Sequence, residues 1–426
     1  MERVIFHIDV NSAFLSWEAT YRVHHLGAKL DLRDIPSVVG GDQEKRHGII
    51  LAKSIPAKKY KIQTGEPVID AKRKCPELVV VPPNYNLYQR SSKALLSILR
   101  RYTDKIEQYS IDEAFMDMTG TEELFGRPEE VANEIRETVY RELGFTVNIG
   151  VSYNKILAKM ASDFQKPNRV HTLWPDEIPI KMWPLPVRDL FFVGRATENK
   201  LLNLGIRTIG EIATFDPYIL KSHMHKHGVT IWKFAHGIDV SEVIDTPPPN
   251  KGYGNSTTIA FDVTDTKTAK LVLLSLAETV SARLRADGVK IGVVSISIRD
   301  CNLQFYGHQI TLDISTDLTT EIYDAACRCF DELWNGIPIR HLGVHTEHVD
   351  GSECRQMSLF DGMDYEKQKR AEMAVDALRK RFGIDSIKRA SFIESPNRDK
   401  ENLIDHMSGG ISREKRTVDY EKEIII

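Results

Sequence analysis

Residues 109–118 read YSIDEAFMDM and place two carboxylates, Asp112 and Glu113, side by side between short β-rich runs. The polar letters SIDE are typical of a tight turn, and the apolar residues on both sides are typical of strands. We therefore expect two strands within residues 102–118, joined by a turn that carries both carboxylates.

Another strand supplies a third carboxylate. Residues 3–10 form a β-rich run that brings Asp9 to the end of a strand. Each acid alone is more consistent with a surface charge or a helix cap, but three carboxylates gathered at one sheet edge need cations. Oxygen ligands without nearby His or Cys favour Mg²⁺, with Mn²⁺ as a substitute, and two such ions about 4 Å apart promote phosphoryl transfer. We predict a two-metal site at Asp9, Asp112 and Glu113.

Strands and helices alternate through the first third of the chain. An amphipathic helix is expected at 128–144, a strand at 145–152 and a second helix at 154–164. This alternation predicts an α+β sheet with helices packed on one side. A group of prolines then marks the entry to a helical unit: Pro167, Pro175, Pro179, Pro184 and Pro186.

Residues 191–213 within the helical unit suggest a helix-hairpin-helix. Gly194 and Gly205 each precede an expected helix. Turn amides in such a hairpin can bind a DNA phosphate without reading sequence. An ordinary pair of antiparallel helices remains an alternative, because Phe192 stands where a first glycine is expected.

The last part of the chain predicts a linker, a second small α+β domain and a polar C-terminal segment. Beyond residue 350 an amphipathic helix is expected, and the final 30 or so residues lack periodicity and are expected to be mobile. The apolar side of that helix would comprise Ala371, Ala374, Val375, Leu378 and Phe382.

Composition excludes several classes of protein. The 426 residues include five scattered cysteines without a CxxC pair, which argues against a disulfide framework and a zinc site. No apolar run approaches the roughly 18 residues that a membrane span requires, and the first residues do not resemble a secretory signal. We expect a cytoplasmic protein without membrane contact. The net charge is −3 overall, but residues 21–84 carry 12 Lys/Arg against 7 Asp/Glu, which fits either a solvated face or an anionic ligand.

Three segments together resemble the palm motifs of Y-family translesion DNA polymerases, the group of DNA polymerase IV-like and UmuC-type enzymes. They are HIDVNSAF at 7–14, YSIDEAFMDM at 109–118 and GVSYNKILAKMASDFQKPN at 150–168. They follow the family's order and spacing, and the resemblance covers roughly residues 3–360. Three long motifs in register are far more specific than one short motif.

The resemblance implies a multidomain α+β right-hand polymerase with a ferredoxin-like palm, small fingers, a helical thumb and an α+β little finger. The expected boundaries are palm 1–20 and 85–173, fingers 21–84, thumb with the helix-hairpin-helix 174–242, linker 243–253, little finger 254–350, and a C-terminal segment 351–426 with a clamp-binding peptide, a helix and a mobile tail. We expect a monomer that acts on a primed DNA template and dNTPs.

The resemblance also implies roles for individual residues. Asp9 and Asp112 would bridge the metal ions, and Glu113 would be the catalytic glutamate. The Val10 carbonyl would ligate the metal on the nucleotide side, and Phe14 would be a steric gate that excludes a ribose 2′-hydroxyl. A core position in the first helix is the structural alternative for Phe14. The nucleotide site would further contain Ala13, Ser54, Lys58 and Lys166.

The fingers motif departs from the family pattern. Residues 54–60 read SIPAKKY, with Ile55 where a Tyr is usual and Lys58 where an Arg is usual. Ile55 cannot donate a phenolic hydrogen bond, and Lys58 lacks the bidentate fork of an arginine. We therefore expect dNTP binding to be weaker than is typical, or differently oriented. Leu51 and Ala52 also differ from the usual pattern above the nascent base pair.

Residues Gln356, Met357, Ser358, Leu359 and Phe360 resemble the peptide that binds the bacterial sliding clamp. The alternative is an apolar contact with the following helix.

Three other classes of function are compatible with part of the sequence. A non-catalytic adaptor for DNA and clamp would not need the three carboxylates. A nucleotide cyclase would not need the hairpin or clamp peptide, and a nuclease would not need a sugar gate.

Overall fold

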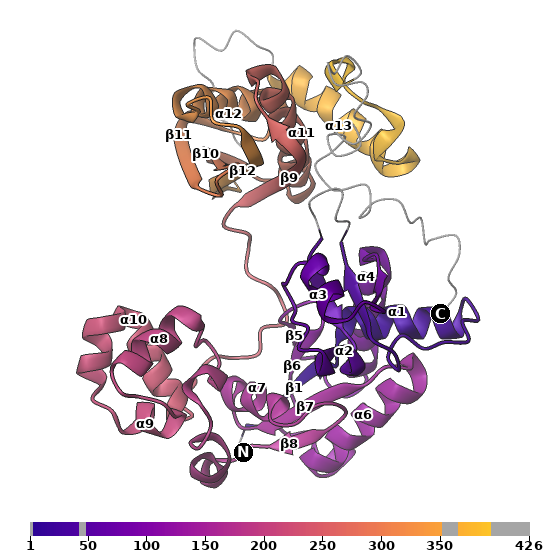
Figure 1. Cartoon of the computed structure of the whole chain (residues 1–426), viewed down its shortest axis with the longest axis vertical. Helices are drawn as coiled ribbons and strands as arrows, with labels where there is room; N and C mark the ends of the chain where they lie inside the picture. Colours follow the sequence, from indigo (N-terminus) through magenta and orange to yellow (C-terminus); the bar gives the residue numbers. More distant parts are fainter. Residues whose placement is uncertain (1–2, 42–47, 352–364, 393–426) are drawn as a thin grey trace. The chain divides into compact units, whose positions relative to one another are not determined.

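The computed structural model describes residues 3–41, 48–351 and 365–392. It divides into two compact units (Figure 1). The first comprises the chain up to residue 39 with 50–65 and 71–247, and the second comprises 40–49, 66–70 and the chain from residue 248. The predicted clamp peptide at 356–360 and the charged tail lie outside the described residues. Within those residues, no helix has the length and apolarity required to cross a membrane.

A five-stranded sheet forms the centre of the first unit. Its strand order is β5-β6-β1-β7-β8, so the first strand lies in the middle. The strands are β1 (Ile5–Val10), β5 (Ile106–Gln108), β6 (Glu113–Asp117), β7 (Val147–Ser152) and β8 (Val170–Thr172). β1 pairs antiparallel with both β6 and β7. The predicted hairpin is therefore β5–β6, and Asp9 lies opposite Glu113 in the register.

Helices cover both faces of this sheet. Successive side chains of a strand point to opposite faces. Phe6 belongs to a core that includes Leu95 and Ile135, whereas Ile5 packs with Ala158 on the other face. The prediction that helices lie on one side only is therefore wrong. The helices around the sheet are α1 (Ala13–His24), α4 (Tyr85–Leu99), α5 (Glu122–Phe125), α6 (Pro128–Leu143) and α7 (Lys155–Asp163).

Gly150 allows α7 to lie directly on β7. A Cβ atom at this position would come within 1.9 Å of the Ala158 carbonyl oxygen and 2.5 Å of the Ser162 nitrogen. Asn154 caps the helix, because its side-chain oxygen accepts from the Leu157 N–H at 2.9 Å. The strand and helix are therefore fixed together beneath the end of β1.

A small three-stranded sheet and two short helices follow α1. The sheet order is β3-β2-β4, with β2 and β4 parallel. These elements are β2 (Ser37–Gly40), β3 (Ile50–Lys53), α2 (Ile55–Lys59), α3 (Val68–Lys74) and β4 (Val79–Val81). Ser54 caps α2 through a hydrogen bond from the Ala57 N–H.

The remainder of the first unit is helical. It contains three short helical segments and three α-helices: η1 (Pro175–Glu177), η2 (Ile178–Met182), η3 (Val187–Asp189), α8 (Arg195–Asn203), α9 (Ile209–Thr214) and α10 (Pro217–Ala235). In the turn before α8, Phe192 adopts φ +73°. This left-handed conformation favours glycine, and Phe192 adopts it although it carries a Cβ atom.

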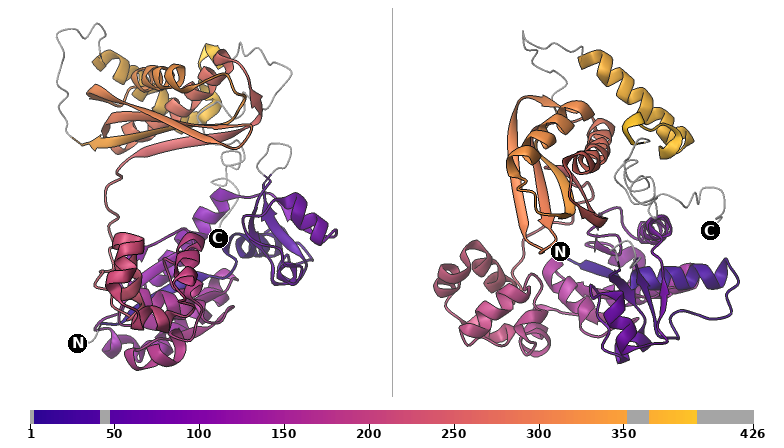
Figure 2. Two further views of the ribbon diagram at one scale, coloured as in Figure 1. Left: turned by 60° about the vertical axis from the view of Figure 1, so that its left-hand side comes forward. Right: turned by 45° about the horizontal axis from the view of Figure 1, so that its top comes forward.

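The second unit contains a four-stranded antiparallel sheet with two helices on one face (Figure 2). The strand order is β11-β10-β12-β9. Its elements are β9 (Tyr253–Val263), α11 (Thr266–Asp287), β10 (Lys290–Asp300), β11 (Phe305–Thr316), α12 (Thr319–Leu333), β12 (Ile339–Asp350), α13 (Tyr365–Phe382), η4 (Ile384–Ser386) and η5 (Ala390–Phe392).

Within this unit, α13 contacts α11 through charged side chains. Arg285 of α11 donates to Glu372 at 2.5 Å and to Asp376 at 2.7 Å. The apolar side predicted for this helix is largely solvent-exposed, with Leu378 42% and Phe382 61% exposed. The helix is correctly placed by its periodicity, but its docked face is the polar one.

Candidate active site

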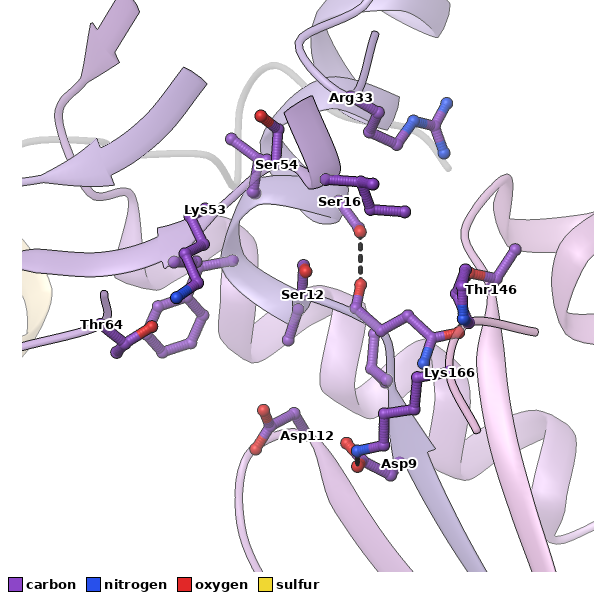
Figure 3. A pocket seen from close by; sticks show the side chains of 18 of the residues that line it. Asp9, Ser12, Ser16, Arg33, Lys53, Ser54, Thr64, Asp112, Thr146 and Lys166 are labelled. Atoms are coloured by element: carbon purple, nitrogen blue, oxygen red, sulfur yellow. Dashed lines mark hydrogen bonds and ion pairs between the residues drawn. The ribbon is translucent and has the colours of Figure 1, made fainter. Parts of the chain in front are cut away.

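A pocket of about 560 Å³ lies where β1 leads into α1 (Figure 3). Eight of the nine predicted catalytic and nucleotide-binding residues line it, and only Glu113 does not. The eight are Asp9, Val10, Ala13, Phe14, Ser54, Lys58, Asp112 and Lys166. Residues far apart in the sequence therefore meet around one cavity.

Asp9 is nearly buried at the end of β1, with 6% of its surface exposed. Lys166 forms an ion pair with its carboxylate and a second one, 2.8 Å long, with Asp163. Burial raises the pKa of Asp9, and the Lys166 ammonium offsets part of that increase. A buried carboxylate of this kind needs a neighbouring cation to remain ionised.

Asp112 is held beside Asp9 by the main chain. The Val10 N–H donates to the Asp112 carbonyl oxygen at 3.1 Å. Its carboxylate accepts from the Ser110 hydroxyl at 2.7 Å, which fixes the turn between β5 and β6. In Figure 3, Asp112 and Asp9 lie at the same end of the pocket.

Glu113 turns towards α7. Its Oε1 accepts from Lys159 Nζ at 2.7 Å, and its Oε2 lies 4.0 Å from His7 Nε2. Burial opposes the charged form of Lys159, but Asp163 and Glu113 outweigh it and raise the pKa of Lys159. Glu113 is therefore the cross-strand neighbour of Asp9 but does not line the pocket.

The donor set suits a hard divalent cation. Among the described residues, no three His, Cys, Asp or Glu side chains gather closely enough to hold a metal ion by themselves. The expected convergence of all three carboxylates is therefore not seen among these residues, and Glu113 accepts a hydrogen bond from Lys159 instead. Asp9 and Asp112 still offer oxygen ligands on the pocket wall, and the ammonium on Asp9 shows that this carboxylate accommodates a cation.

Phe14 forms part of the pocket wall and is braced from behind. Its ring stacks on Tyr88, with centroids 4.4 Å apart and planes 7° apart. The buried Tyr88 hydroxyl donates to Glu18 at 3.1 Å, and burial raises the pKa of Tyr88. A ring held in this way is a rigid surface at the pocket wall.

The fingers side of the pocket carries the residues that depart from the family pattern. Ile55 is 50% exposed and lines the pocket together with Lys58. Ser54 also lines it, but its hydroxyl is already engaged. It accepts from the N–H groups of Ser37 and Ala57 and donates to the Ile35 carbonyl at 2.7 Å. Its role in the structure is to hold α2 against the small sheet.

Comparison with known proteins identifies the family. The model of the impB/mucB/samB family matches residues 8–163, that of its C-terminal domain matches 250–359, and that of the family's HHH motif matches 175–206. The chain belongs to the impB/mucB/samB family.

Curated relatives of this family member are named DNA polymerase IV. The Clostridium acetobutylicum protein is 42% identical, covering 92% of this chain and 99% of the relative. The Acetivibrio thermocellus protein is also 42% identical, and the match covers 92% of this chain and 98% of the relative. DNA polymerase IV 2 of Bacillus subtilis is 37% identical, and the match covers 92% of this chain and 94% of the relative.

A solved structure shows the same fold. A chimera of the Y-family DNA polymerases Dbh and Dpo4 superimposes with a TM-score of 0.69 at 22% identity, covering 81% of this chain and 99% of the chimera. The resemblance to Y-family polymerases seen in the sequence is confirmed, as is the right-hand α+β architecture that it implies. The family is metal-dependent.

Sequence reasoning missed the asparagines that hold the Lys166 loop of this family member. The Asn11 side-chain oxygen accepts from the Asn168 N–H at 2.8 Å, and Asn148 Nδ2 donates to the Gln165 carbonyl at 2.8 Å. Both amides are buried at the ends of strands. A polar amide in or directly after an apolar strand was the available signal, because such a group must find partners inside the protein.

Proposed function

We propose that this chain is a template-directed DNA polymerase that adds dNTPs to a primer 3′-hydroxyl by two-metal phosphoryl transfer. The observation that carries the proposal is the shared pocket of Asp9, Asp112, Phe14, Lys58 and Lys166 in a member of this family. The oxygen ligands suit metal ions, the lysines suit a triphosphate, and the ring suits a deoxyribose.

Each residue has a distinct task in this proposal. Asp9 and Asp112, with the Val10 carbonyl, would hold Mg²⁺ or Mn²⁺, and Glu113 would complete the site. When bound, these ions lower the pKa of the attacking hydroxyl and neutralise the triphosphate. Lys58 and Lys166 would orient the phosphates.

Phe14 selects the sugar in this proposal. Because its ring is fixed against Tyr88, a ribose 2′-hydroxyl could not displace it. A Phe14→Ala variant should incorporate rNTPs, and unchanged sugar selection in that variant would remove the ring from this role.

Lesion bypass follows from loose checking of the nascent pair. An open pocket leaves discrimination to pairing and stacking energies of a few kcal/mol, so errors and damaged bases are tolerated.

We assign the boundaries of palm, fingers, thumb, linker and little finger as the sequence predicts. We also propose that the protein acts as a monomer.

Primer extension tests the activity. Wild type should extend a primed template with Mg²⁺ and dNTPs, and Asp112→Ala/Glu113→Ala should not, while still binding the DNA. No extension by a folded, DNA-binding wild type would favour the non-catalytic adaptor. Cyclisation of ATP in the same preparation would indicate a cyclase.

The peptide Gln356–Phe360 is the proposed contact with a bacterial sliding clamp. Tethering raises the effective concentration of the primer end and so increases processivity. Deleting 356–360 should reduce synthesis on clamp-loaded primers and leave clamp-free synthesis almost unchanged. Equal loss in both assays would reject the tether. The cytoplasmic location remains a prediction.

A further inference from the structure

α10 is interrupted at His225. This residue adopts φ 53° and ψ −136°, a combination that costs a non-glycine residue free energy. The two halves of the helix meet tightly at Gly228, where a Cβ atom would come within 2.3 Å of the Leu220 carbonyl oxygen. The interruption is therefore fixed by packing, and strain held in this way is common at binding sites.

The surface at this interruption is strongly basic. Residues 217–235 contain three lysines, three histidines and no Asp or Glu. Lys221, Lys226 and Lys233 are all exposed. No carboxylate among the described residues pairs with any of the three, whereas Lys181 in the same helical region pairs with Glu177. Unpaired lysines on one surface favour an anionic partner.

These side chains surround a hollow of about 610 Å³. Tyr218, at one wall, has 80% of its surface exposed. The complete lining is Tyr218, Lys221, Ser222, His225, Lys226, Val229, Thr230 and Lys233. An exposed aromatic ring among lysines is the combination that binds unpaired bases together with their phosphates.

We propose that this hollow, the α10 groove, binds single-stranded DNA. The three lysines contact successive phosphates, and an unpaired base stacks on Tyr218. A duplex would present only its sugar-phosphate edge and leave the ring and the hollow unused. The groove is distinct from the hairpin at 191–213, and the inference rests on the proposed function in one respect, that the anion is DNA.

Binding of a fluorescent oligo-dT by the full chain over a range of salt concentrations tests the groove. Each phosphate contact to a single strand contributes a slope of about 0.7 in log K against log salt. Lys221→Ala/Lys226→Ala/Lys233→Ala should make this negative slope shallower by about 2 and leave the affinity for blunt duplex within about twofold. The matched control Lys29→Ala/Lys93→Ala/Lys105→Ala makes the same charge change at exposed lysines elsewhere and should not alter the slope.

The stacking contact is tested separately. Tyr218→Ala should weaken oligo-dT binding at least about fivefold, and Tyr218→Phe should preserve it. An oligonucleotide with 5-iodouracil should photo-crosslink to Tyr218. Equal losses for duplex and single strand, no loss for either, or crosslinks confined to other residues would each overturn the proposal. None of these measurements requires polymerisation, so failure of the proposed activity is recognised independently.

Discussion

Asp9 and Glu113 are direct partners across the β1–β6 ladder, yet their carboxylates are bound by different lysines. Lys166 binds Asp9 from the loop after α7, whereas Lys159 binds Glu113 from within α7. The two acids thus have different cationic partners although the backbone places them side by side. Lys159 is, on this geometry, a positioning residue for the glutamate.

Replacing Lys159 should reduce catalysis more than substrate binding. In Lys159→Met the Glu113 carboxylate loses its 2.7 Å partner, so we expect kcat to fall by about tenfold or more while KM for dNTP changes little. Lys159→Arg should restore part of kcat. The control is Lys155→Met, which removes a comparable 2.7 Å ion pair of α7 with Glu107. An equal fall in kcat for both variants would show that only helix packing matters.

The effect on dNTP binding of the two departures from the family pattern, Ile55 and Lys58, should be reversible by mutation. Ile55 and Lys58 line the pocket without a phenolic donor or a guanidinium fork. We expect Ile55→Tyr/Lys58→Arg to lower KM for dNTP by about five- to tenfold, because two hydrogen bonds to phosphate are added. Lys59→Arg, on the same helix but outside the pocket lining, should leave KM unchanged. An unaltered KM in the double variant would defeat this explanation.

Most of the predicted site residues that the structure brings together at the pocket are those whose chemistry is local. Asp9 and Asp112 follow from carboxylates at a strand end and in a turn, and both line the pocket. The pairing of Glu113 with Lys159 could not be predicted, because it depends on which face of the sheet α7 covers. That face is set by the tertiary contact at Gly150, and periodicity reports only which side of a helix is apolar.

Gly150→Ala should be severely destabilising. The added methyl group would overlap the Ala158 carbonyl at 1.9 Å, so α7 would have to move away from β7. We expect a loss of about 3 kcal/mol or more in the free energy of unfolding, measured by denaturant titration or as a lower Tm. Gly194→Ala, where no atom beyond the neighbouring backbone lies within 4 Å of the added carbon, is the control. Similar stabilities for the two variants would contradict the packing described for α7.

His7 should make the folding stability of the first unit decrease at acidic pH. The imidazole is fully buried, and its Nδ1 lies 2.8 Å from the Ser162 hydroxyl. Burial, with Lys159 and Lys166 nearby, lowers the pKa of His7 well below its usual value. Below the unfolded pKa of about 6.5, the unfolded chain binds a proton that the folded chain does not. Folding free energy is therefore lost as pH falls, by up to about 1.4 kcal/mol for each pH unit.

His7→Gln removes this titration, so the stability gap between wild type and variant should shrink between pH 7 and pH 5. Unfolding at several pH values, followed by intrinsic fluorescence, measures the gap. Ser162→Ala removes the hydrogen-bond partner but retains the imidazole. The difference in unfolding free energy between wild type and this variant should therefore stay nearly constant with pH. If the His7→Gln gap were also constant, the imidazole would have to take up its proton in the folded chain, which its burial beside two ammonium groups opposes.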